Sequence, residues 1–191
     1  MKKIALEDIM GLSAYEKVRE KFRQRVIELK KKRRVSVGDK VSLVFENRDT
    51  VIFQIQEMLR VEKIAELDKI REEIETYNGL LPEPGELSAT LFLEIDDQVR
   101  LRDELLKFLG IDETIFLKAG DHLIHARFEK GRSKEDKISA VQYVRFLFAQ
   151  EAREAFVQGE KTDLMIDHPN YKVSVPLAPE TRRSLIDDLT A

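Results

Sequence analysis

Cysteine is absent from this chain of 191 residues. The protein therefore has no disulfide, no thiolate nucleophile, no cysteine-ligated iron–sulfur cluster and no cysteine-rich zinc site. Asparagine is also scarce and occurs only at positions 47, 78 and 170. Few asparagines and no cysteine, together with abundant Glu and Lys, are a composition that leans toward a thermophilic protein.

Long apolar runs are missing as well. No segment approaches the roughly 20 consecutive apolar residues that are needed to cross a bilayer. The N-terminal stretch MKKIALED lacks the apolar region of a secretory signal peptide. We therefore expect a soluble, cytoplasmic protein. Gly-rich phosphate loops, dinucleotide fingerprints and nucleophile elbows are also absent, which argues against the familiar nucleotide-dependent chemistries.

Charge is what the sequence has in abundance. Asp, Glu, Lys and Arg make up 36% of the residues, yet the formal net charge is only −3. Charges of both signs are therefore interspersed, which suits surface ion-pair networks better than attraction to one charged partner. With 42% apolar residues, the chain is long enough to bury a core as a single domain over residues 1–191.

The first part of this domain, about residues 1–80, has the periodicity of helices. The capping-box pattern Ser13-Ala14-Tyr15-Glu16 precedes apolar residues spaced by three and four, up to the basic run at 30–34. Asn47 is the predicted N-cap of a helix from Arg48 to about Glu62. A second helix is predicted from 64 to 77, with a bend near 63–65 because the apolar stripe changes phase there.

The remainder, about residues 86–177, is predicted to be rich in strands, and a C-terminal helix follows at about 179–189. A short hairpin is also predicted earlier, at 35–37 and 41–45. Alternating apolar residues and turn signals predict further strands at 87–95, 114–118, 122–128, 137–148, 164–166 and 171–175, with helices at 98–109 and 150–157. Helices first and then strands with short turns favour an α+β fold, in which N-terminal helices pack on a mainly antiparallel sheet.

The predicted helix from Arg48 to Glu62 is the strongest candidate for a functional segment. At 100° per residue, its apolar residues share one arc, and both Arg48 and Glu62 fall inside this arc. A charge on a buried face must be paired or must shift its pKa, which makes such positions functional candidates. The alternatives are a Glu62 that reaches water, a surface pair of Glu57 with Arg60, or a dimer contact. The candidate polar site comprises Arg48, Gln54, Glu57, Arg60, Glu62, His168 and Tyr171.

A metal or acid–base site is one use for these residues. If the turn Asp167–Tyr171 packs against the helix, Glu57, Glu62 and His168 would supply carboxylates and an imidazole for a divalent metal or for proton transfer. The alternative is that Asp167–Tyr171 is only a tight turn. His122 and His125 lie three apart on a predicted strand, so they point to opposite faces and do not share a metal.

The basic run at the end of the first helix is a candidate nucleic-acid contact. It consists of Lys30, Lys31, Lys32, Arg33 and Arg34, and clustered cations of this kind bind phosphates. The alternative is that the run only interacts favourably with the dipole at the C-terminus of the helix. The chain is slightly acidic overall and the run contains no aromatic residue, which favours the alternative.

Several segments together resemble a known family. These are Phe45–Glu62, with the sequence FENRDTVIFQIQEMLRVE, and the later DHPNY at 167–171, supported by 31–35, 77–78 and 139–141. With them, nearly the whole chain is similar to the bacterial domain-of-unknown-function family 3501, to whose motifs no established catalytic role is attached.

The resemblance also implies a cellular context. Similar proteins are encoded beside rubrerythrin-like di-iron proteins and Fe–S oxidoreductases, which implies an accessory or interaction role near peroxide or electron-transfer metabolism. Because the chain has no thiolate, it would not itself hold a cluster through cysteines. Three hypotheses result: a non-catalytic accessory protein of such a redox system, a metal-binding or acid–base enzyme, and a nucleic-acid-binding protein, each as a monomer or a homo-oligomer.

Overall fold

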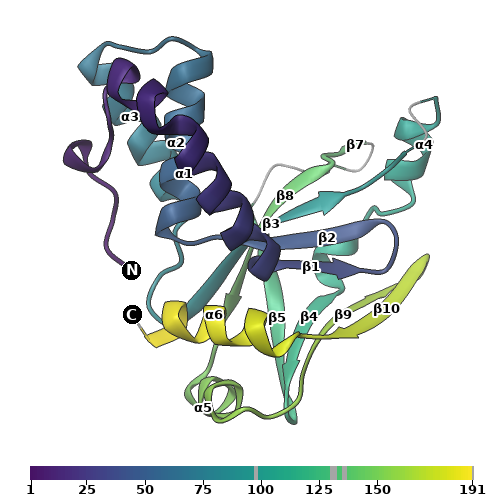
Figure 1. Cartoon of the computed structure of the whole chain (residues 1–191). Helices are drawn as coiled ribbons and strands as arrows, with labels where there is room; N and C mark the ends of the chain where they lie inside the picture. Colours follow the sequence, from purple (N-terminus) through teal and green to yellow (C-terminus); the bar gives the residue numbers. More distant parts are fainter. Residues whose placement is uncertain (97–98, 130–132, 135–136, 191) are drawn as a thin grey trace.

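The computed structural model describes residues 1–96, 99–129, 133–134 and 137–190 (Figure 1). Eight strands form one sheet in the order β1-β2-β3-β8-β5-β4-β9-β10, and all neighbouring strands are antiparallel. Their bounds are β1 Arg34–Val37, β2 Val41–Phe45, β3 Glu86–Leu93, β4 Ile115–Ala119, β5 His122–Phe128, β8 Val141–Leu147, β9 Thr162–His168 and β10 Tyr171–Pro176. A separate pair joins β6 (Ser133–Lys134) to β7 (Lys137–Ile138). The predicted α+β class and antiparallel sheet are confirmed.

The sheet curls until its two edge strands approach each other. The Tyr171 hydroxyl, at the start of β10, donates to the Val37 carbonyl of β1 at 2.8 Å. The same oxygen accepts from the Lys40 amide at 3.0 Å. Tyr171 therefore joins the two edges, and this reduces the exposure of unpaired strand groups.

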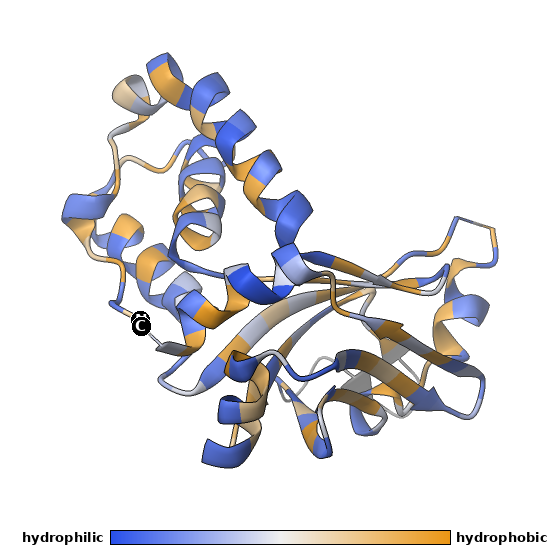
Figure 2. Ribbon diagram, turned by 60° about the horizontal axis from the view of Figure 1, so that its bottom comes forward, coloured by the Kyte–Doolittle hydropathy of each residue, from blue (hydrophilic) through white to orange (hydrophobic). Residues whose placement is uncertain are grey.

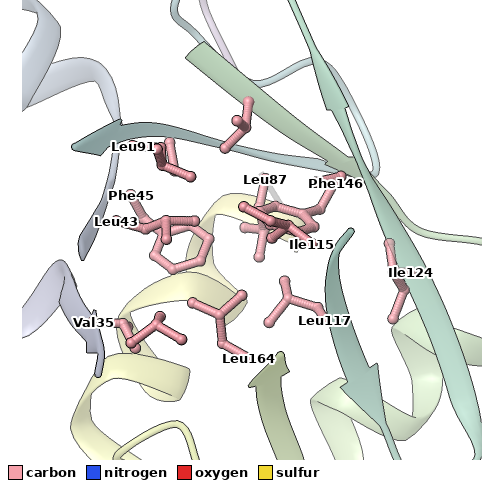
Figure 3. Packing of buried hydrophobic residues seen from close by; sticks show 14 of the residues in the cluster. Val35, Leu43, Phe45, Leu87, Leu91, Ile115, Leu117, Ile124, Phe146 and Leu164 are labelled. Carbon is pink, nitrogen blue, oxygen red and sulfur yellow. The ribbon is translucent and has the colours of Figure 1, made fainter. Parts of the chain in front are cut away.

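One face of the curled sheet encloses the main hydrophobic core (Figure 3). Alternation along β3 places Leu87, Ala89 and Leu91 in this core, so Ser88 and Thr90 lie on the opposite, outer face. α5 (Gln150–Gln158) and α6 (Pro179–Thr190) also contribute to the core, through Phe156, Leu185 and Leu189 among others. α4 (Leu101–Leu106) and the short η2 (Ile111–Glu113) complete the strand-rich part.

The three N-terminal helices form a group of their own beside the sheet (Figure 1). They are α1 (Leu12–Arg33), α2 (Arg48–Val61) and α3 (Leu67–Asn78), preceded by the short η1 (Leu6–Asp8). A second hydrophobic cluster holds α2 and α3 together, and it contains Ile4, Val51, Ile52, Ile55, Leu59, Ile74 and Leu81. Hydrophilic residues are interspersed with apolar ones along every part of the chain (Figure 2).

The predicted N-cap of α2 and the predicted break after this helix are confirmed. The Asn47 side chain caps the helix by accepting from the Thr50 amide at 3.1 Å, and the Thr50 hydroxyl accepts from the Asn47 amide at 2.9 Å. The predicted break also occurs, because α2 ends at Val61 and Lys63 adopts a positive φ of 53°. The chain then continues into α3.

Other local predictions were wrong. The expected cap at Ser13 is not formed, since α1 begins at Leu12 with Gly11 as its N-cap, which places Ser13 inside the helix. The strand predicted at 137–148 is divided into β7 and β8. β9 extends through His168, so the turn before β10 contains only Pro169 and Asn170.

The described helices include none that combines the length with the apolar character that crossing a membrane requires.

Candidate functional site

A cavity of about 420 Å³ lies between α3 and the outer face of the sheet. Its size is within the range of small-molecule sites in proteins. Glu73, Thr76 and Tyr77 of α3 line one side, and residues of β3, β5 and β8 line the other. The polar residues on the sheet side are Ser88, Arg127, Glu129, Tyr143 and Arg145. The apolar lining residues include Met58 and Leu80. Glu46, between β2 and α2, also lines the cavity. We call this space the α3–sheet cavity.

Glu46 is the buried acid of the α3–sheet cavity, with only 3% of its surface exposed. One carboxylate oxygen accepts from the Thr90 hydroxyl at 2.6 Å. The other accepts from the Thr50 hydroxyl and from the Gln54 amide, the latter at 3.1 Å. All these donors are neutral, so Glu46 is oriented without an ion-pair partner for its side chain within the described residues.

The main chain around Glu46 is also fixed. Its amide donates to the Ser88 carbonyl at 2.8 Å, and its carbonyl accepts from the Arg33 guanidinium at 3.0 Å. Glu46 occupies the turn between β2 and the Asn47 cap of α2. The end of a strand and the start of a helix therefore hold this carboxyl group in one position.

Two arginines face each other on the sheet wall of the cavity. Arg127 of β5 is paired in register with Arg145 of β8, and like charges directly opposite each other are destabilising. Arg145 is compensated, because it donates to Glu86 at 2.7 Å and to the carbonyls of Leu81, at 3.2 Å, and Gly79. Arg127 is exposed, and its side chain forms no hydrogen bond or ion pair with the part of the chain that the structure describes.

The helix wall carries an acid and a phenol one turn apart. Desolvation raises the pKa of Tyr77, and the proximity of Tyr143 and Glu73 raises it further. The hydroxyl of Tyr77 and the carboxylate of Glu73 have no hydrogen-bond partner among the described residues. The cavity thus contains polar groups that nothing in the described chain satisfies, namely the acid Glu73 and Tyr77 on α3 and the cation Arg127 on β5, while Glu129 also lines the sheet side.

The residues of the predicted polar site lie in several separate places. Gln54 does not line the cavity, but it donates to Glu46, which does. Glu57 instead faces α1, where its two oxygens accept from Arg19 at 2.7 Å each and from the Tyr15 hydroxyl at 2.8 Å. The Arg19 hydrogen bonds lower the pKa of Glu57 despite its partial desolvation. Glu57 therefore acts as a clamp between α1 and α2.

The remaining charges on α2 are also engaged elsewhere. Arg60 donates to Glu16 of α1 at 2.7 Å. Arg48 pairs with Asp8 of η1, although its Nε is buried without a partner. Glu62, at the C-terminal end of α2, is exposed. None of these three residues lines the α3–sheet cavity.

The structure does not assemble the predicted metal ligands Glu57, Glu62 and His168. His168 is 3% exposed, and its Nε2 lies 2.8 Å from the Leu109 carbonyl, whereas Glu57 contacts α1 and Glu62 lies at the end of α2. Within the described ranges, no group of three His, Cys, Asp or Glu residues is placed to hold a metal. The condition for this metal site, packing of the Asp167–Tyr171 turn against α2, is not met, because β10 pairs with β9 and contacts β1 instead.

The basic run offers fewer free cations than the sequence suggests. Arg33 is 1% exposed and donates to the carbonyls of Phe45 and Glu46, to Ser184 and to Asp188. Arg34 bonds to Ser42 at 2.7 Å and to Glu94 at 2.8 Å. Arg33 is therefore a structural residue and is not available to phosphates.

Sequence reasoning missed most of the cavity. It identified the segment Arg48–Glu62, which follows Glu46, but it did not select Glu46, Glu73, Arg127 or Arg145. A charged residue directly after the apolar strand Val41–Phe45 was the available signal for Glu46. For Arg127 the sequence contains no signal, because its only distinction is the lack of a partner in space.

Comparisons with known proteins complete this description. A family model described as "Protein of unknown function (DUF3501)" matches residues 3–189. The crystal structure of a novel protein of unknown function from Burkholderia pseudomallei K96243 is 33% identical to this chain, with a TM-score of 0.93. The match covers 98% of this chain and 100% of that one. No curated protein matches the chain.

Proposed function

The chain belongs to the family described as "Protein of unknown function (DUF3501)", and we propose that it is an accessory protein that binds a small polar molecule in the α3–sheet cavity. One observation carries this proposal. Arg127, Glu73 and Tyr77 line one cavity of about 420 Å³, and none has a partner in the described chain. Polar groups in a hollow that a protein does not satisfy itself are the groups that orient a ligand.

The rigid surroundings support the same proposal. Glu46 is held by Thr50, Thr90 and Gln54, and Arg145 is held by Glu86 and two carbonyls. A site whose walls are fixed before the ligand arrives loses little conformational freedom on binding. The fixed residues therefore shape the cavity, and the unpartnered ones are available to a ligand.

Equilibrium dialysis of the full chain tests this proposal. The protein is dialysed against a defined mixture of amino acids, carboxylic acids, amines, sugars and nucleotides, and mass spectrometry identifies what is retained. Thr76→Trp places a large side chain on the cavity wall, whereas Glu75→Trp changes an exposed residue of the same helix that does not line it. Retention by the wild type and by Glu75→Trp, but not by Thr76→Trp, is expected. If nothing is retained by the wild type, the proposal is wrong.

The proposed accessory role also includes a partner. The genomic context implied by the family resemblance supports service to a rubrerythrin-like or Fe–S oxidoreductase redox system. In that system the partner would hold the metal centre, since this chain has no cysteine for a cluster. A chromosomally tagged copy, purified at native expression level beside an untagged control strain, is expected to enrich a di-iron or Fe–S protein. Enrichment of neither would contradict this part of the proposal.

Acid–base catalysis by Glu46 is a second candidate function. A buried carboxyl group at the wall of a cavity is the arrangement that general acids and bases use, and the Thr50, Thr90 and Gln54 bonds fix its direction. Incubation of a retained compound with stoichiometric protein would reveal conversion by mass spectrometry. Conversion that persists unchanged in Glu46→Gln would exclude Glu46 as the proton-transfer group.

A further inference from the structure

Five charged residues line the α3–sheet cavity, and two of opposite sign, Arg127 and Glu73, lie on opposite walls. Arg127 comes from β5 and Glu73 from α3, and both line the same space. These two described residues form no ion pair with each other or with any other described residue. Both side chains are therefore available to the charged groups of a ligand that binds between them.

The arginine side of the cavity favours a carboxylate. Arg127 lies directly opposite Arg145 in the β5–β8 register, and this juxtaposition of like charges costs stability. Arg145 already has Glu86 as its counter-ion at 2.7 Å, whereas Arg127 has none among the described residues. A bound carboxylate would offset the repulsion, and the planar guanidinium is suited to hold it through two hydrogen bonds.

The helix side of the cavity favours an ammonium group. Glu73 offers carboxylate oxygens that have no donor among the described residues, and the Tyr77 hydroxyl beside it also lacks a partner. Glu46 lines the same cavity but already accepts from three donors, so it shapes the site and is not a free acceptor. A primary ammonium group has three N–H donors and no acceptor, which matches such a set.

The space between the charged groups is bounded by apolar surface. Met58 and Leu80 line the cavity together with the rings of Tyr77 and Tyr143. Aromatic rings add a favourable surface for both apolar groups and cations. A ligand of matching chemistry therefore has an apolar or aromatic body in addition to its two charged groups.

From this arrangement we infer that the ligand is a zwitterion with an apolar body, as in an apolar or aromatic α-amino acid, its carboxylate on Arg127 and its ammonium group toward Glu73. The inference rests on the proposed function, because it specifies the ligand of that same site. An acid without an amine would face Glu46 and Glu73, and an amine without an acid would face Arg127. Each would leave one wall unsatisfied.

Isothermal titration of the full chain with three related compounds tests this inference. L-Phenylalanine carries both charges, phenethylamine lacks the carboxylate, and 3-phenylpropionate lacks the amine. L-Phenylalanine is expected to bind about tenfold or more tightly than either analogue, because each loses one charge-assisted contact. L-Leucine and 4-methylpentanoate repeat the comparison with an aliphatic body.

Two variants assign the two ends of the ligand. Arg127→Gln is expected to remove the preference for L-phenylalanine over phenethylamine, while the preference over 3-phenylpropionate is kept. Glu73→Gln is expected to do the reverse. Arg102→Gln and Glu72→Gln change exposed residues that do not line the cavity, and they are expected to bind like the wild type.

The outcomes separate this inference from the proposed function. If an analogue with one charge binds as tightly as the amino acid, or if Arg127→Gln keeps the full preference, the zwitterion inference is overturned. The same holds if neither amino acid binds while another class of compound is retained in the dialysis, in which case the binding function stands. If dialysis retains nothing, both are wrong.

Discussion

Arg33 and Asp188, which are 155 residues apart in the sequence, form a buried ion pair between α1 and α6. Arg33 also donates to the carbonyls of Phe45, at 2.8 Å, and Glu46, at 3.0 Å. One guanidinium therefore connects the C-terminal helix with the strand–helix turn that carries the cavity acid. The end of α1, the helix α6 and the turn that carries Glu46 therefore meet at this side chain.

The buried pair is expected to contribute strongly to stability. Asp188→Ala leaves the Arg33 guanidinium buried without its counter-ion, and loss of one partner of a buried pair costs about 3–5 kcal/mol. Urea unfolding followed by circular dichroism measures this loss as a lower midpoint. Asp187→Ala alters the adjacent, exposed residue and is expected to leave the midpoint nearly unchanged. An equal effect of both variants would show that the loss arises from the helix and not from the ion pair.

Tyr171 is expected to stabilise the closure of the sheet. Tyr171→Phe removes the hydroxyl that donates to Val37 and accepts from Lys40, and the unpaired backbone groups should cost about 1–3 kcal/mol. Amide hydrogen exchange should increase at Lys40 first. If exchange at Lys40 and the unfolding midpoint both stay at wild-type values, Tyr171 does not hold the edges together.

Gly38 gives an independent test of the same closure. A Cβ atom at this position would lie 2.3 Å from the Tyr171 hydroxyl oxygen, and the φ of +77° disfavours other residues. Gly38→Ala is therefore expected to destabilise the wild type. In the Tyr171→Phe background the steric part of this penalty should shrink, while the backbone part remains. A penalty that is identical in both backgrounds would argue against the close approach.

The clamp between α1 and α2 is expected to weaken in acid. Arg19 holds the pKa of Glu57 below its ordinary value of 4.5, so the folded state binds this proton less readily than the unfolded state. The contribution of Glu57 is therefore fully present above that ordinary value, and it is lost as the pH falls through the lowered folded pKa. Unfolding midpoints of wild type and Glu57→Gln should converge in this acidic range. Glu28→Gln, at an exposed pair with Lys31, should run parallel to the wild type, and parallel curves for Glu57→Gln would contradict the prediction.

Replacement of Arg127 and replacement of Arg145 are expected to have different effects on the free energy of unfolding, although the two residues lie opposite each other in the β5–β8 register. Arg127→Gln removes a repulsion but no side-chain hydrogen bond or ion pair with a described residue, so the free energy of unfolding should stay constant or rise by about 0.2–1 kcal/mol. Arg145→Gln should lower it by about 1–3 kcal/mol, because Glu86 and the carbonyls of Gly79 and Leu81 lose their donor. Thermal unfolding of both variants checks the contrast. A clear loss of stability in Arg127→Gln would mean that its role is structural and not directed at a ligand.

Much of the secondary structure could be predicted from the sequence because the signals are local. The Asn47 cap, the apolar stripe of α2 and its end before Lys63 depend on residues within a few positions of one another. The alternation in β3 likewise indicated which side chains enter the core. The predicted Ser13 cap was wrong because Gly11, a residue type that is also accepted at the N-cap, takes this position and the helix begins at Leu12.

The sequence by itself determined a cysteine-free α+β chain with mixed charge, and it pointed to Arg48–Glu62 as the candidate segment. It did not determine which charges are paired. Periodicity indicates that one face of an element is covered but not by which element, so Arg33 was indistinguishable from its basic neighbours until α6 placed Asp188 beside it. In the same way, Glu46, Glu73 and Arg127 are far apart in the sequence and line one cavity only because the fold places α3 across from β5 and β8. Only the tertiary structure decided which residues form the candidate site, because the neighbours of a charged side chain in space determine whether it is already paired or can contact a ligand.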